Sequence, residues 1–438
     1  MNAYPTYKPS GIEWLGDIPE HWDVWKLSSK FKDISSGTTP LAGNDRFYNN
    51  GTIPWVNTGD LNDSFLESCK KKVTATAIDE CSALKIHPSG VLIIAMYGAT
   101  IGKLGIVNFE ACCNQACCVI GQSKSVSTEY LFYWLMGNRK EIVNRAYGGG
   151  QPNISQEVIK RLKITCPLMS EQTAITNYLD DKTSKLDRLI KNKKEQIAQL
   201  KEIRQIEINT AVTKGLNPTA KLKPSGIEWL GDVPEHWEVK RLKQIVSTKI
   251  TDGPHTTPDF VDEGVPFISA SAINHNRINF ERFRGYITEE LDAEYSEKVK
   301  PQRNDIFIVK SGATTGRIAC VETDMNFNIW SPLALVRSNP NRTYYKYIFF
   351  QLQSQVFKTQ IELGWSFGTQ ENIGMGILEC LFLAVPQQKE QTAIANYLDE
   401  KTSKLDQLVN NLENQIAQLQ ELRKIEIFNA VTGKIKVA

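Results

Sequence analysis

The chain has 438 residues, of which 41% are hydrophobic and 23% are charged, and its formal net charge is +2. This length allows two to four domains, and the composition excludes a disordered or low-complexity protein. A net charge so close to zero also excludes a protein that binds nucleic acid by bulk attraction alone, although it permits a basic patch on one face.

The sequence gives no sign of a membrane segment. Its first residues, MNAYPTYKPSG, contain neither the basic nor the apolar region of a signal peptide. The longest apolar run, residues 91–97, is far shorter than the roughly 20 residues that span a bilayer. We therefore expect a cytoplasmic protein.

A short segment near the start of the chain occurs again in its middle. Residues 8–27 are KPSGIEWLGDIPEHWDVWKL and residues 223–242 are KPSGIEWLGDVPEHWEVKRL, so 16 of 20 positions are identical. The segment is rich in Trp, Pro and Gly, which predicts an irregular conformation held by aromatic side chains. His21 and His236 are equivalent positions beside a Trp, and we interpret them as hydrogen-bonded anchors rather than catalytic groups.

The first insert, residues 28–166, mixes short apolar strands with turns and a helix-like stretch at 129–136. Its most apolar strand leads into the turn GATIGK at 98–103. A P-loop needs four residues between its glycines and a Ser or Thr after the Lys, whereas this turn has three residues and a Leu. We predict a tight turn that presents a hydroxyl and a cation to a phosphate, with a plain surface hairpin as the alternative.

Four of the nine cysteines cluster at positions 112, 113, 117 and 118. A zinc site would need a second pair of ligands, and the five histidines supply none at a suitable spacing. We interpret the cluster as small buried residues on a strand and expect no bound metal.

A long segment follows the first insert and recurs near the end of the chain, because residues 171–215 and 390–434 are identical at 30 of 45 positions. Within these segments, residues 171–213 and 390–432 contain no Pro or Gly, and each predicts a helix of roughly 64 Å at about 1.5 Å per residue. Apolar side chains recur three and four residues apart, which indicates a coiled-coil-like contact. We expect the two helices to pair antiparallel, with packing of each helix on its own insert as the alternative. Residues expected in the contact are Leu186, Leu189, Ile197, Leu200, Leu405, Leu408, Leu412 and Leu419.

The second insert, residues 243–385, follows the outline of the first despite low identity. The turn GATTGR at 312–317 corresponds to GATIGK, and the closing loop at 364–374 corresponds to GGGQPNIS at 148–155. The first insert contains 15 Lys and Arg against 11 Asp and Glu, whereas the second contains 14 against 16. The inserts are therefore similar in outline and different in charge.

These patterns predict a mixed α/β or α+β protein with two globular domains, two long antiparallel helices that form a coiled coil, and internal pseudo-twofold symmetry. If the chain were closed into a circle, each helix would be followed by one Trp-rich segment. We therefore expect the N-terminal segment to dock near the end of the second helix. The expected boundaries are 1–27 and 216–242 for the repeated segments, 28–166 and 243–385 for the inserts, and 167–215 and 386–438 for the helices.

No catalytic constellation is apparent in the sequence. It contains no Asn/Asp-Pro-Pro-aromatic tetrapeptide of an amino-methyltransferase. No Ser/His/Asp or Cys/His set occurs in both inserts. We therefore expect the chain not to be an enzyme.

Taken together, the motifs resemble the specificity subunit of type I restriction–modification systems. The resemblance is carried by the two PSGIEWLGD-x-PEHW segments, the two EQTAI-x-NYLD-x-KTSKLD helices, and the turns GATIGK, GATTGR and GGGQPNIS. It covers essentially the whole chain. The paired order of segment, insert and helix is more specific than any single motif.

This resemblance implies that the inserts are target recognition domains, each of which reads one half of a split, asymmetric DNA sequence. It implies that the helices fix the spacing between the half-sites. It also implies two modification subunits that resemble adenine N6-methyltransferases, and two restriction subunits that can join them. S-adenosylmethionine, ATP and Mg²⁺ are expected on these partners, and no cofactor is expected on this chain.

We expect DNA contacts from loop residues with donor or bidentate side chains. In the first insert these are Asn44, Arg46, Thr100, Lys103, Gln151 and Asn153. In the second insert they are His255, Lys310, Thr314, Arg317, Gln370 and Asn372. Lys103 and Arg317 are interpreted as phosphate contacts rather than base readers. The alternative function is a pseudo-symmetric coiled-coil adaptor whose inserts bind proteins.

Overall fold

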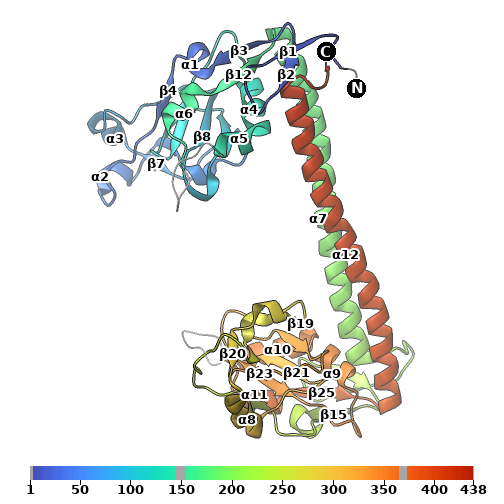
Figure 1. Ribbon diagram of the computed structural model, residues 1–438. Helices are drawn as coiled ribbons and strands as arrows, with labels where there is room; N and C mark the ends of the chain where they lie inside the picture. The colour runs from blue at the N-terminus through green and yellow to red at the C-terminus, as the bar shows by residue number, and fades with distance from the viewer. Residues whose placement is uncertain (1–2, 145–152, 365–371, 438) are drawn as a thin grey trace. The chain divides into compact units, whose positions relative to one another are not determined.

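The computed structural model describes residues 3–144, 153–364 and 372–437, and the chain forms two compact units (Figure 1). The first unit contains residues 1–193 and 413–438, and the second contains residues 194–412. Each unit therefore holds one Trp-rich segment, one insert, the first half of one long helix and the second half of the other.

Short strands and helices alternate along the part of each insert that the structure describes. The first unit contains the strands β1 (Tyr7–Pro9), β2 (Asp17–Pro19), β3 (Asp23–Lys26), β4 (Ile34–Ser36), β5 (Ile53–Val56), β6 (Ser64–Leu66), β7 (Lys72–Val73), β8 (Val91–Ala95), β9 (Leu104–Val107), β10 (Cys112–Cys113), β11 (Cys117–Ile120) and β12 (Lys163–Cys166). Its shorter helices are α1 (Leu27–Lys30), α2 (Asp45–Tyr48), α3 (Ala75–Glu80), α4 (Thr128–Gly137), α5 (Arg139–Val143) and α6 (Gln156–Arg161).

The second unit repeats this order with its own variations. Its strands are β13 (Leu222–Pro224), β14 (Asp232–Pro234), β15 (Glu238–Arg241), β16 (Thr251–Asp252), β17 (Val265–Ile268), β18 (Ile273–Asn274), β19 (Arg277–Ile278), β20 (Gly285–Ile287), β21 (Ile306–Val309), β22 (Ile318–Cys320), β23 (Asn328–Ile329), β24 (Leu333–Val336) and β25 (Phe382–Val385). Its shorter helices are α8 (Glu289–Lys298), α9 (Tyr345–Gln351), α10 (Gln355–Gly364) and α11 (Met375–Cys380).

Each insert is built on a sheet whose central strand is apolar. The strand order is β4-β11-β8-β9-β6 in the first unit and β16-β24-β21-β22 in the second. The central strands β8 and β21 are buried at every position, as expected of continuous apolar runs bounded by turns. A smaller sheet accompanies each main sheet, with the orders β10-β5-β7 and β20-β17-β23.

The repeated Trp-rich segments form the base of each insert. In the first unit β3 pairs antiparallel with β12, so the insert ends beside the point where it begins. β15 and β25 form the same pair in the second unit. Trp22 and Trp237 are fully buried in the two units. Tyr7 Oη donates a hydrogen bond to Gly433 O at 3.2 Å, so the N-terminal segment lies beside the end of the second long helix, as the circular argument predicts.

The long helices are α7 (Met169–Lys214) and α12 (Gln388–Val431). Gly215 and Gly433 follow them with φ angles of +75° and +74°, a conformation that glycine adopts at helix ends with little strain. In the first unit, Tyr178 on α7 donates to Glu426 on α12 at 2.8 Å. In the second unit, Tyr397 donates to Glu207 at 2.8 Å, with the roles of the two helices exchanged.

A second pair of equivalent contacts gives the direction of the helices. Arg423 lies 3.2 Å from Asp187 in the first unit, and Arg204 lies 3.1 Å from Asp406 in the second. Residue numbers rise along α7 as the numbers of its partners on α12 fall. The helices are therefore antiparallel within each unit.

The helix contact buries a stripe with alternating steps of three and four residues, as in a heptad repeat. The most buried members of this stripe are Thr183, Leu186, Ile190, Ile197, Thr402 and Leu405. Three other predicted contact residues are half-buried, and they are Leu200, Leu412 and Leu419. Leu189 and Leu408 are 47% and 51% exposed and lie outside the stripe, which corrects the sequence prediction. The stripe steps by four residues here, from 186 to 190 and from 405 to 409.

The first insert also contacts the last turn of α12, and the second insert contacts the last turn of α7. Tyr130 Oη and Thr165 Oγ1 lie 3.2 Å and 2.8 Å from the carbonyl oxygen of Val431. In the second unit, Gln351 Nε2 donates to the carbonyl oxygen of Val212 at 2.9 Å. These donors satisfy a carbonyl near the helix end.

The structure confirms the expected mixed α+β fold with two long helices. The four clustered cysteines lie on β10 and β11, where burial raises the pKa of each thiol. No set of three His, Cys, Asp or Glu residues that could hold a metal occurs among the described residues. Within the same residues, no helix is both long and apolar enough to cross a membrane.

Candidate nucleic-acid interface

One end of the main sheet gathers most of the candidate residues that the structure describes in each unit. In the first unit β4 and β8 end there, and β9 and β11 begin there, because neighbouring strands are antiparallel. In the second unit β16, β21, β22 and β24 meet in the same way. The loops that leave these strand ends therefore lie close together in each unit.

The two glycine turns at this sheet end have the same backbone. The amide of Lys103 donates to Thr100 O at 2.9 Å, and the amide of Arg317 donates to Thr314 O at 3.1 Å. Other residues rarely adopt the positive φ angles that each turn requires at two positions. The glycines with these angles are Gly98, Gly102, Gly312 and Gly316. The backbone conformation therefore fixes the spacing of the two glycines in GATIGK and in GATTGR. A cation, Lys103 or Arg317, directly follows the second glycine of each turn.

The closing loop of each insert pairs with the start of its turn. An isolated bridge joins Tyr97 to Asn153 in the first unit, and another joins Ser311 to Asn372 in the second. Asn153 and Asn372 therefore lie directly beside the two turns, as an interface that combines turn and closing loop requires. Two further predicted residues, Gln151 and Gln370, lie outside the described residues.

A third loop leaves the sheet end after a glycine that touches the neighbouring backbone. A Cβ atom on Gly37 would lie 2.0 Å from the carbonyl oxygen of Cys113. A Cβ atom on Gly253 would lie 1.9 Å from the carbonyl oxygen of Ile329. Only glycine permits this approach, so the loops after both glycines start in the same way.

Asn44 and Arg46 lie apart from the other candidates of the first unit, on the short helix α2. Asn44 caps this helix by accepting a hydrogen bond from the Arg46 amide at 3.2 Å. The Arg46 guanidinium lies 2.9 Å from Glu80 on α3, and both side chains are exposed. The structure thus gives Asn44 a structural role and leaves Arg46 in a surface ion pair, which contributes little to stability.

In the second unit a buried carboxylate organises the third loop. Asp252 lies 2.7 Å from Lys298, 2.9 Å from Lys310 and 3.2 Å from His255. Burial by itself raises the pKa of Asp252, but the hydrogen bonds from Lys298 and Lys310 outweigh it and hold the pKa below its ordinary value. His255 projects to solvent, whereas the ammonium group of Lys310 is held inside.

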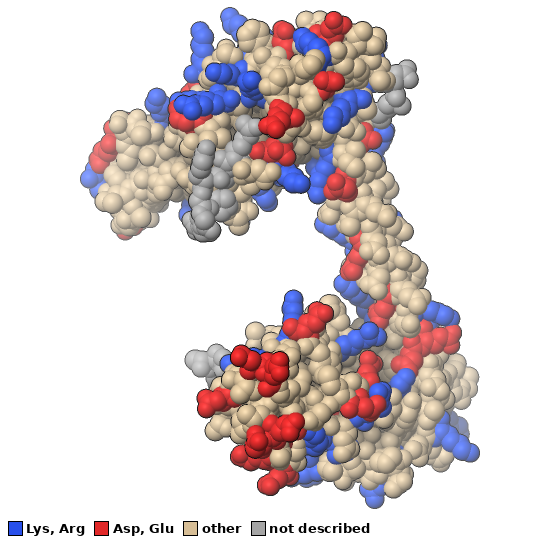
Figure 2. Space-filling view, viewed as in Figure 1, with Lys and Arg blue, Asp and Glu red and all other residues tan. Residues whose placement is uncertain are grey.

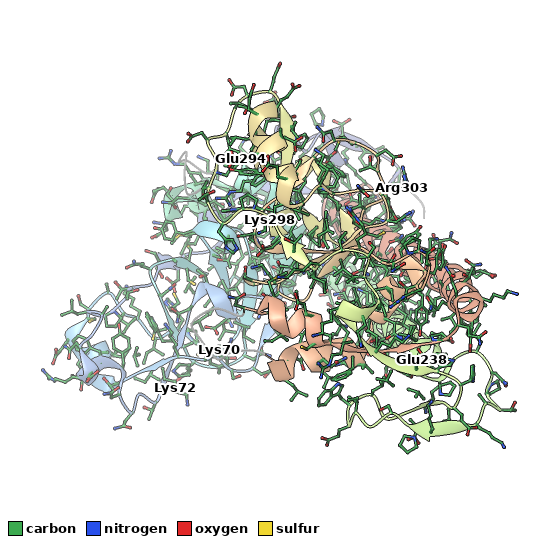
Figure 3. The ribbon with its side chains drawn as sticks, turned by 90° about the horizontal axis from the view of Figure 1, so that it is seen from below. Lys70, Lys72, Glu238, Glu294, Lys298 and Arg303 are labelled. Atoms are coloured by element: carbon green, nitrogen blue, oxygen red, sulfur yellow. The ribbon has the colours of Figure 1, made fainter. Side chains whose placement is uncertain are left out.

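Sequence reasoning missed Asp252 and Lys298 at this site. Lys298 is the last residue of α8 (Figure 3). Its partner lies 46 residues earlier, and no local spacing signal connects the two positions. It also missed the exposed run from Lys70 to Lys72 in the first unit, which three consecutive lysines could have indicated.

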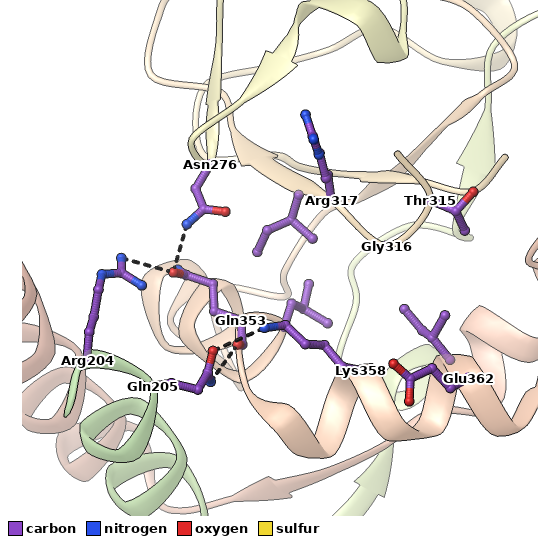
Figure 4. Close-up of a pocket in the computed structure, with 12 residues that line it drawn as sticks. Arg204, Gln205, Asn276, Thr315, Gly316, Arg317, Gln353, Lys358 and Glu362 are labelled. Carbon is purple, nitrogen blue, oxygen red and sulfur yellow. Dashed lines mark hydrogen bonds between the residues drawn. The ribbon is translucent and has the colours of Figure 1, made fainter. Parts of the chain in front are cut away.

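The space behind the glycine turn differs between the units. In the first unit Arg139 fills it, because its Nε donates to Gly102 O at 2.9 Å and its Nη1 donates to Asp63 at 3.0 Å. In the second unit the corresponding space is a pocket of about 340 Å³ (Figure 4). Arg317 lines this pocket, and Figure 4 shows its guanidinium group pointing away from the Gln353 side chain.

The charged surface also differs along the chain. Figure 2 shows acidic side chains gathered over the part of the second unit where α8 lies in Figure 1. The first turn of α8 contains Glu289, Glu290 and Asp292. A nucleic acid is repelled from this first turn, whereas Lys298 at the opposite end of α8 lies beside Asp252 with the other cations of the sheet end, which are the better contact in this unit.

The two histidines of the Trp-rich segments have carboxylate partners at the start of the long helices. His21 lies 3.0 Å from Glu171, and His236 lies 2.9 Å from Glu390. Trp237 Nε1 also donates to Glu390 at 3.1 Å. These contacts agree with the interpretation of both histidines as hydrogen-bonded anchors of the segment.

Comparison with known proteins identifies the family. The family described as "Type I restriction modification DNA specificity domain" matches residues 19–199 and again residues 234–418. The chain therefore belongs to this family and contains its domain twice, which confirms the resemblance seen in the repeated motifs.

Relatives agree over nearly the whole length. The type I restriction enzyme MjaVIII specificity subunit of Methanocaldococcus jannaschii is 23% identical over 428 residues, which cover 96% of this chain and 94% of that protein. A solved chain from a study of complex assembly and conformational transition of the type I R-M system has a TM-score of 0.72 at 17% identity, covering 95% of this chain and 99% of that one. The HsdS subunit from Thermoanaerobacter tengcongensis has a TM-score of 0.51 at 16% identity, with 95% and 98% covered. At these identities the two structures show a shared fold.

Proposed function

We propose that each unit reads one half of a bipartite, asymmetric DNA target with the loops at its sheet end. The proposal is supported by a contrast between the two sheet ends, which have equivalent backbone turns but different side chains. The two glycine turns and the two close glycine approaches repeat. Thr100, Lys103 and Asn153 occupy the first sheet end, while His255, Arg317 and Asn372 occupy the second.

Amide and basic side chains are suited to this role. Asn reads adenine through two hydrogen bonds in the major groove, and Arg or Lys contacts guanine or a phosphate. Lys103 and Arg317 follow the turns directly, where a phosphate contact would fix the register of the DNA. Because the two sets of side chains differ, the two half-sites should differ as well, whereas a homodimer would require a palindrome.

The helices α7 and α12 would set the distance between the half-sites. The support for this role is a buried heptad stripe in both units and two pairs of equivalent cross-helix contacts. Half-sites that are contacted from one side of DNA lie about 34–36 Å apart, or a multiple of that distance.

We further propose that two modification subunits dock on the frame and carry out adenine methylation. Six apolar side chains on the helices are between 42% and 54% exposed and come in equivalent pairs. These residues are Leu189, Leu422 and Ile425 in the first unit, and Leu408, Ile203 and Ile206 in the second. Exposed apolar side chains that repeat with the symmetry of the frame favour two equivalent protein partners.

In this proposal the chain itself is not the catalyst. S-adenosylmethionine would be bound by the modification subunits, which would flip the target adenine out of the duplex. ATP and Mg²⁺ would belong to two restriction subunits. The support for this division is the DNA specificity domain that occupies both inserts.

An exchange of one insert tests the proposal. Residues 28–166 are replaced by the insert of another family member, the chain is expressed with its modification subunit, and adenine methylation is mapped across the genome. We expect a split motif in which only one half has changed. A change in both halves would contradict independent reading by the two units. No methylated motif from the natural chain, in the presence of a stable complex, would favour the protein-binding adaptor.

A further inference from the structure

We infer that Asp252 is a positioning residue for DNA recognition by the second unit and holds His255 and Lys298 in place as DNA contacts. This inference rests on the proposed function and deepens it, because it names the buried group that orients the reading side chains. It also gives Lys310 an internal role in place of the DNA contact that the sequence predicts.

The carboxylate of Asp252 is enclosed at the end of β16, with 6% of the residue exposed. Lys310 is similarly buried, at 8%, and its ammonium group lies 2.9 Å from the carboxylate. A buried charge requires a partner, and Lys310 supplies it from the end of β21. The pair therefore stabilises Asp252 in its ionised form, which is the form that accepts hydrogen bonds from further donors.

The other two partners of Asp252 face solvent. The side chains of His255 and Lys298 are 70% and 51% exposed. Both are thus anchored at one atom by a buried carboxylate and accessible to a ligand elsewhere. An anchored donor side chain contacts a phosphate or base edge with less loss of side-chain entropy than a free one.

The loop that carries His255 is itself fixed to the sheet end. Gly253 has the close approach described above, and Ser331 N donates to Pro254 O at 3.2 Å. Trp330 precedes Ser331, and the Arg284 guanidinium lies 4.2 Å from its ring centroid. His255 therefore projects from a rigid part of the same sheet end that carries Arg317 and Asn372.

Among the described residues of the first unit, the positions equivalent to Asp252 and Lys310 carry no charge. Strand pairing makes Ser36 equivalent to Asp252, because Ser36 pairs with Cys118 where Asp252 pairs with Ala334. Met96 is equivalent to Lys310, since each residue follows the central strand. The backbone carbonyl oxygen of each also accepts a hydrogen bond from a backbone amide of the closing loop. The first insert thus has the same backbone arrangement, but Ser36 and Met96 carry a hydroxyl and a thioether instead of the two charged groups. Asp252 should therefore affect only the half-site that the second unit reads.

This difference supplies a test that preserves the fold. The double variant Asp252→Ser with Lys310→Met transfers the residues of the first unit and removes both buried charges together. The complete chain, purified with its modification subunit, is assayed for methylation of DNA that carries single-base changes in either half-site. We expect an unchanged melting temperature and unchanged discrimination at the first half-site. At the second half-site we expect discrimination to fall by about tenfold or more, as for a lost base or phosphate contact.

Single variants keep the test decisive if the double variant is unstable. His255→Gln and Lys298→Gln alter exposed side chains and should each weaken recognition of the second half-site. In the background of the double variant they should have little further effect, because their anchor is already lost. The matched control is Asp324→Asn, which breaks the exposed Arg303–Asp324 pair of the same unit and should change neither half-site.

Two outcomes would overturn the inference. One is full discrimination at the second half-site in the double variant or, if that variant is unstable, in both single variants. The other is an effect of His255→Gln and Lys298→Gln that adds fully to the effect of the double variant. Both outcomes assume that the natural chain recognises a split site. If it does not, the proposed function itself fails, so the two failures are distinguishable.

Discussion

The interiors of the two units solve the same packing problem with different chemistry. In the second unit a buried carboxylate at the start of the central strand, Asp305, is paired with Arg337 on the neighbouring strand through two hydrogen bonds of 2.7 Å. Strand pairing places Val91 and Gly121 at the equivalent positions of the first unit. Ser36 and Met96 likewise stand where the second unit has Asp252 and Lys310.

This contrast shows which features the architecture itself requires. Positive-φ glycines, close backbone approaches and helix contacts occur in both units, because they define the path of the chain. The pairs Asp252–Lys310 and Asp305–Arg337 belong to the second unit, and at the equivalent positions of the first unit both members of each pair are replaced together. The side chains of an insert can therefore vary in coordinated sets while its backbone stays the same, as a domain that must recognise different ligands requires.

The largest expected effect comes from breaking an ion pair that only the second unit has. Asp305→Val introduces the residue of the first unit but leaves the half-buried Arg337 guanidinium without its carboxylate partner. We expect a loss of about 3–5 kcal/mol in the free energy of unfolding, measured by denaturant titration. Adding Arg337→Met should recover most of this loss, because no charge then stays unpaired. A loss below about 1 kcal/mol for the single variant would show that the pair is not required in this way.

The next largest effect should be the same in both units. Gly37→Ala and Gly253→Ala each place a methyl group within about 2 Å of a carbonyl oxygen, so the backbone must move apart. We expect each change to cost about 2–3 kcal/mol of stability. Gly376→Ala is the control, because nothing lies within 4 Å of the added atom in helix α11. Unequal costs at the two sites would show that the loops do not leave their sheets equivalently.

The smallest effect distinguishes the units by pH. Burial lowers the pKa of His87 in the first unit, although Asp33 opposes this shift. The unfolded chain, with a His pKa of about 6.5, then binds more protons as the pH falls. The stability that neutral His87 contributes is present above about pH 6.5 and is lost as the pH falls through its folded pKa.

The carboxylates of the second unit respond in a lower pH range. Burial by itself raises the pKa of Asp252 and Asp292, but hydrogen bonds from lysine outweigh it and lower both values. Their contribution is present above about pH 3.9 and is lost only as the pH falls through the folded pKa. Between pH 7.5 and 5.5, hydrogen-exchange protection, corrected for the pH dependence of intrinsic exchange, should therefore fall more in the first unit than in the second, and His87→Gln should reduce this difference. An equal fall in protection in both units would contradict the assignment.

Much of the frame could be predicted from the sequence because it is repeated. Two copies of a Trp-rich segment and of a helix reveal the order of the elements, and the docking of the N-terminal segment near Gly433 follows from that order. Thr100 with Asn153 and Thr314 with Asn372 could be chosen as equivalent candidates of the two units because both glycine turns and both closing loops occur in the same order.

The errors in the helix contact have a physical cause. Both Leu189 and Ile190 are apolar, so steps of three and four residues from Leu186 both find a candidate. Only the partner helix decides which one is buried, and the structure selects Ile190. Leu405 presents the same ambiguity, because Leu408 and Val409 both follow it. A single sequence contains the period of the contact but not its exact phase.

The internal role of Lys310 could not be predicted for a related reason. A lysine before a glycine turn is usually exposed, and only the strand order shows that Asp252 lies beside it. Lys298 reaches the same carboxylate from the last residue of α8, whereas the equivalent helix of the first insert, α3, is shorter and ends at Glu80. Tertiary contacts between distant segments decide such cases, and residue type alone does not.

The division of the long helices between the units has a consequence for synthesis on the ribosome. The second unit is continuous in sequence, from residue 194 to residue 412, whereas the first needs residues 413–438 to be complete. The second unit can therefore finish folding while the first still lacks the helix end that accepts hydrogen bonds from Tyr130 and Thr165. The unit that is translated first would be the last to acquire its full core, and a chain that stops early would expose this unfinished surface.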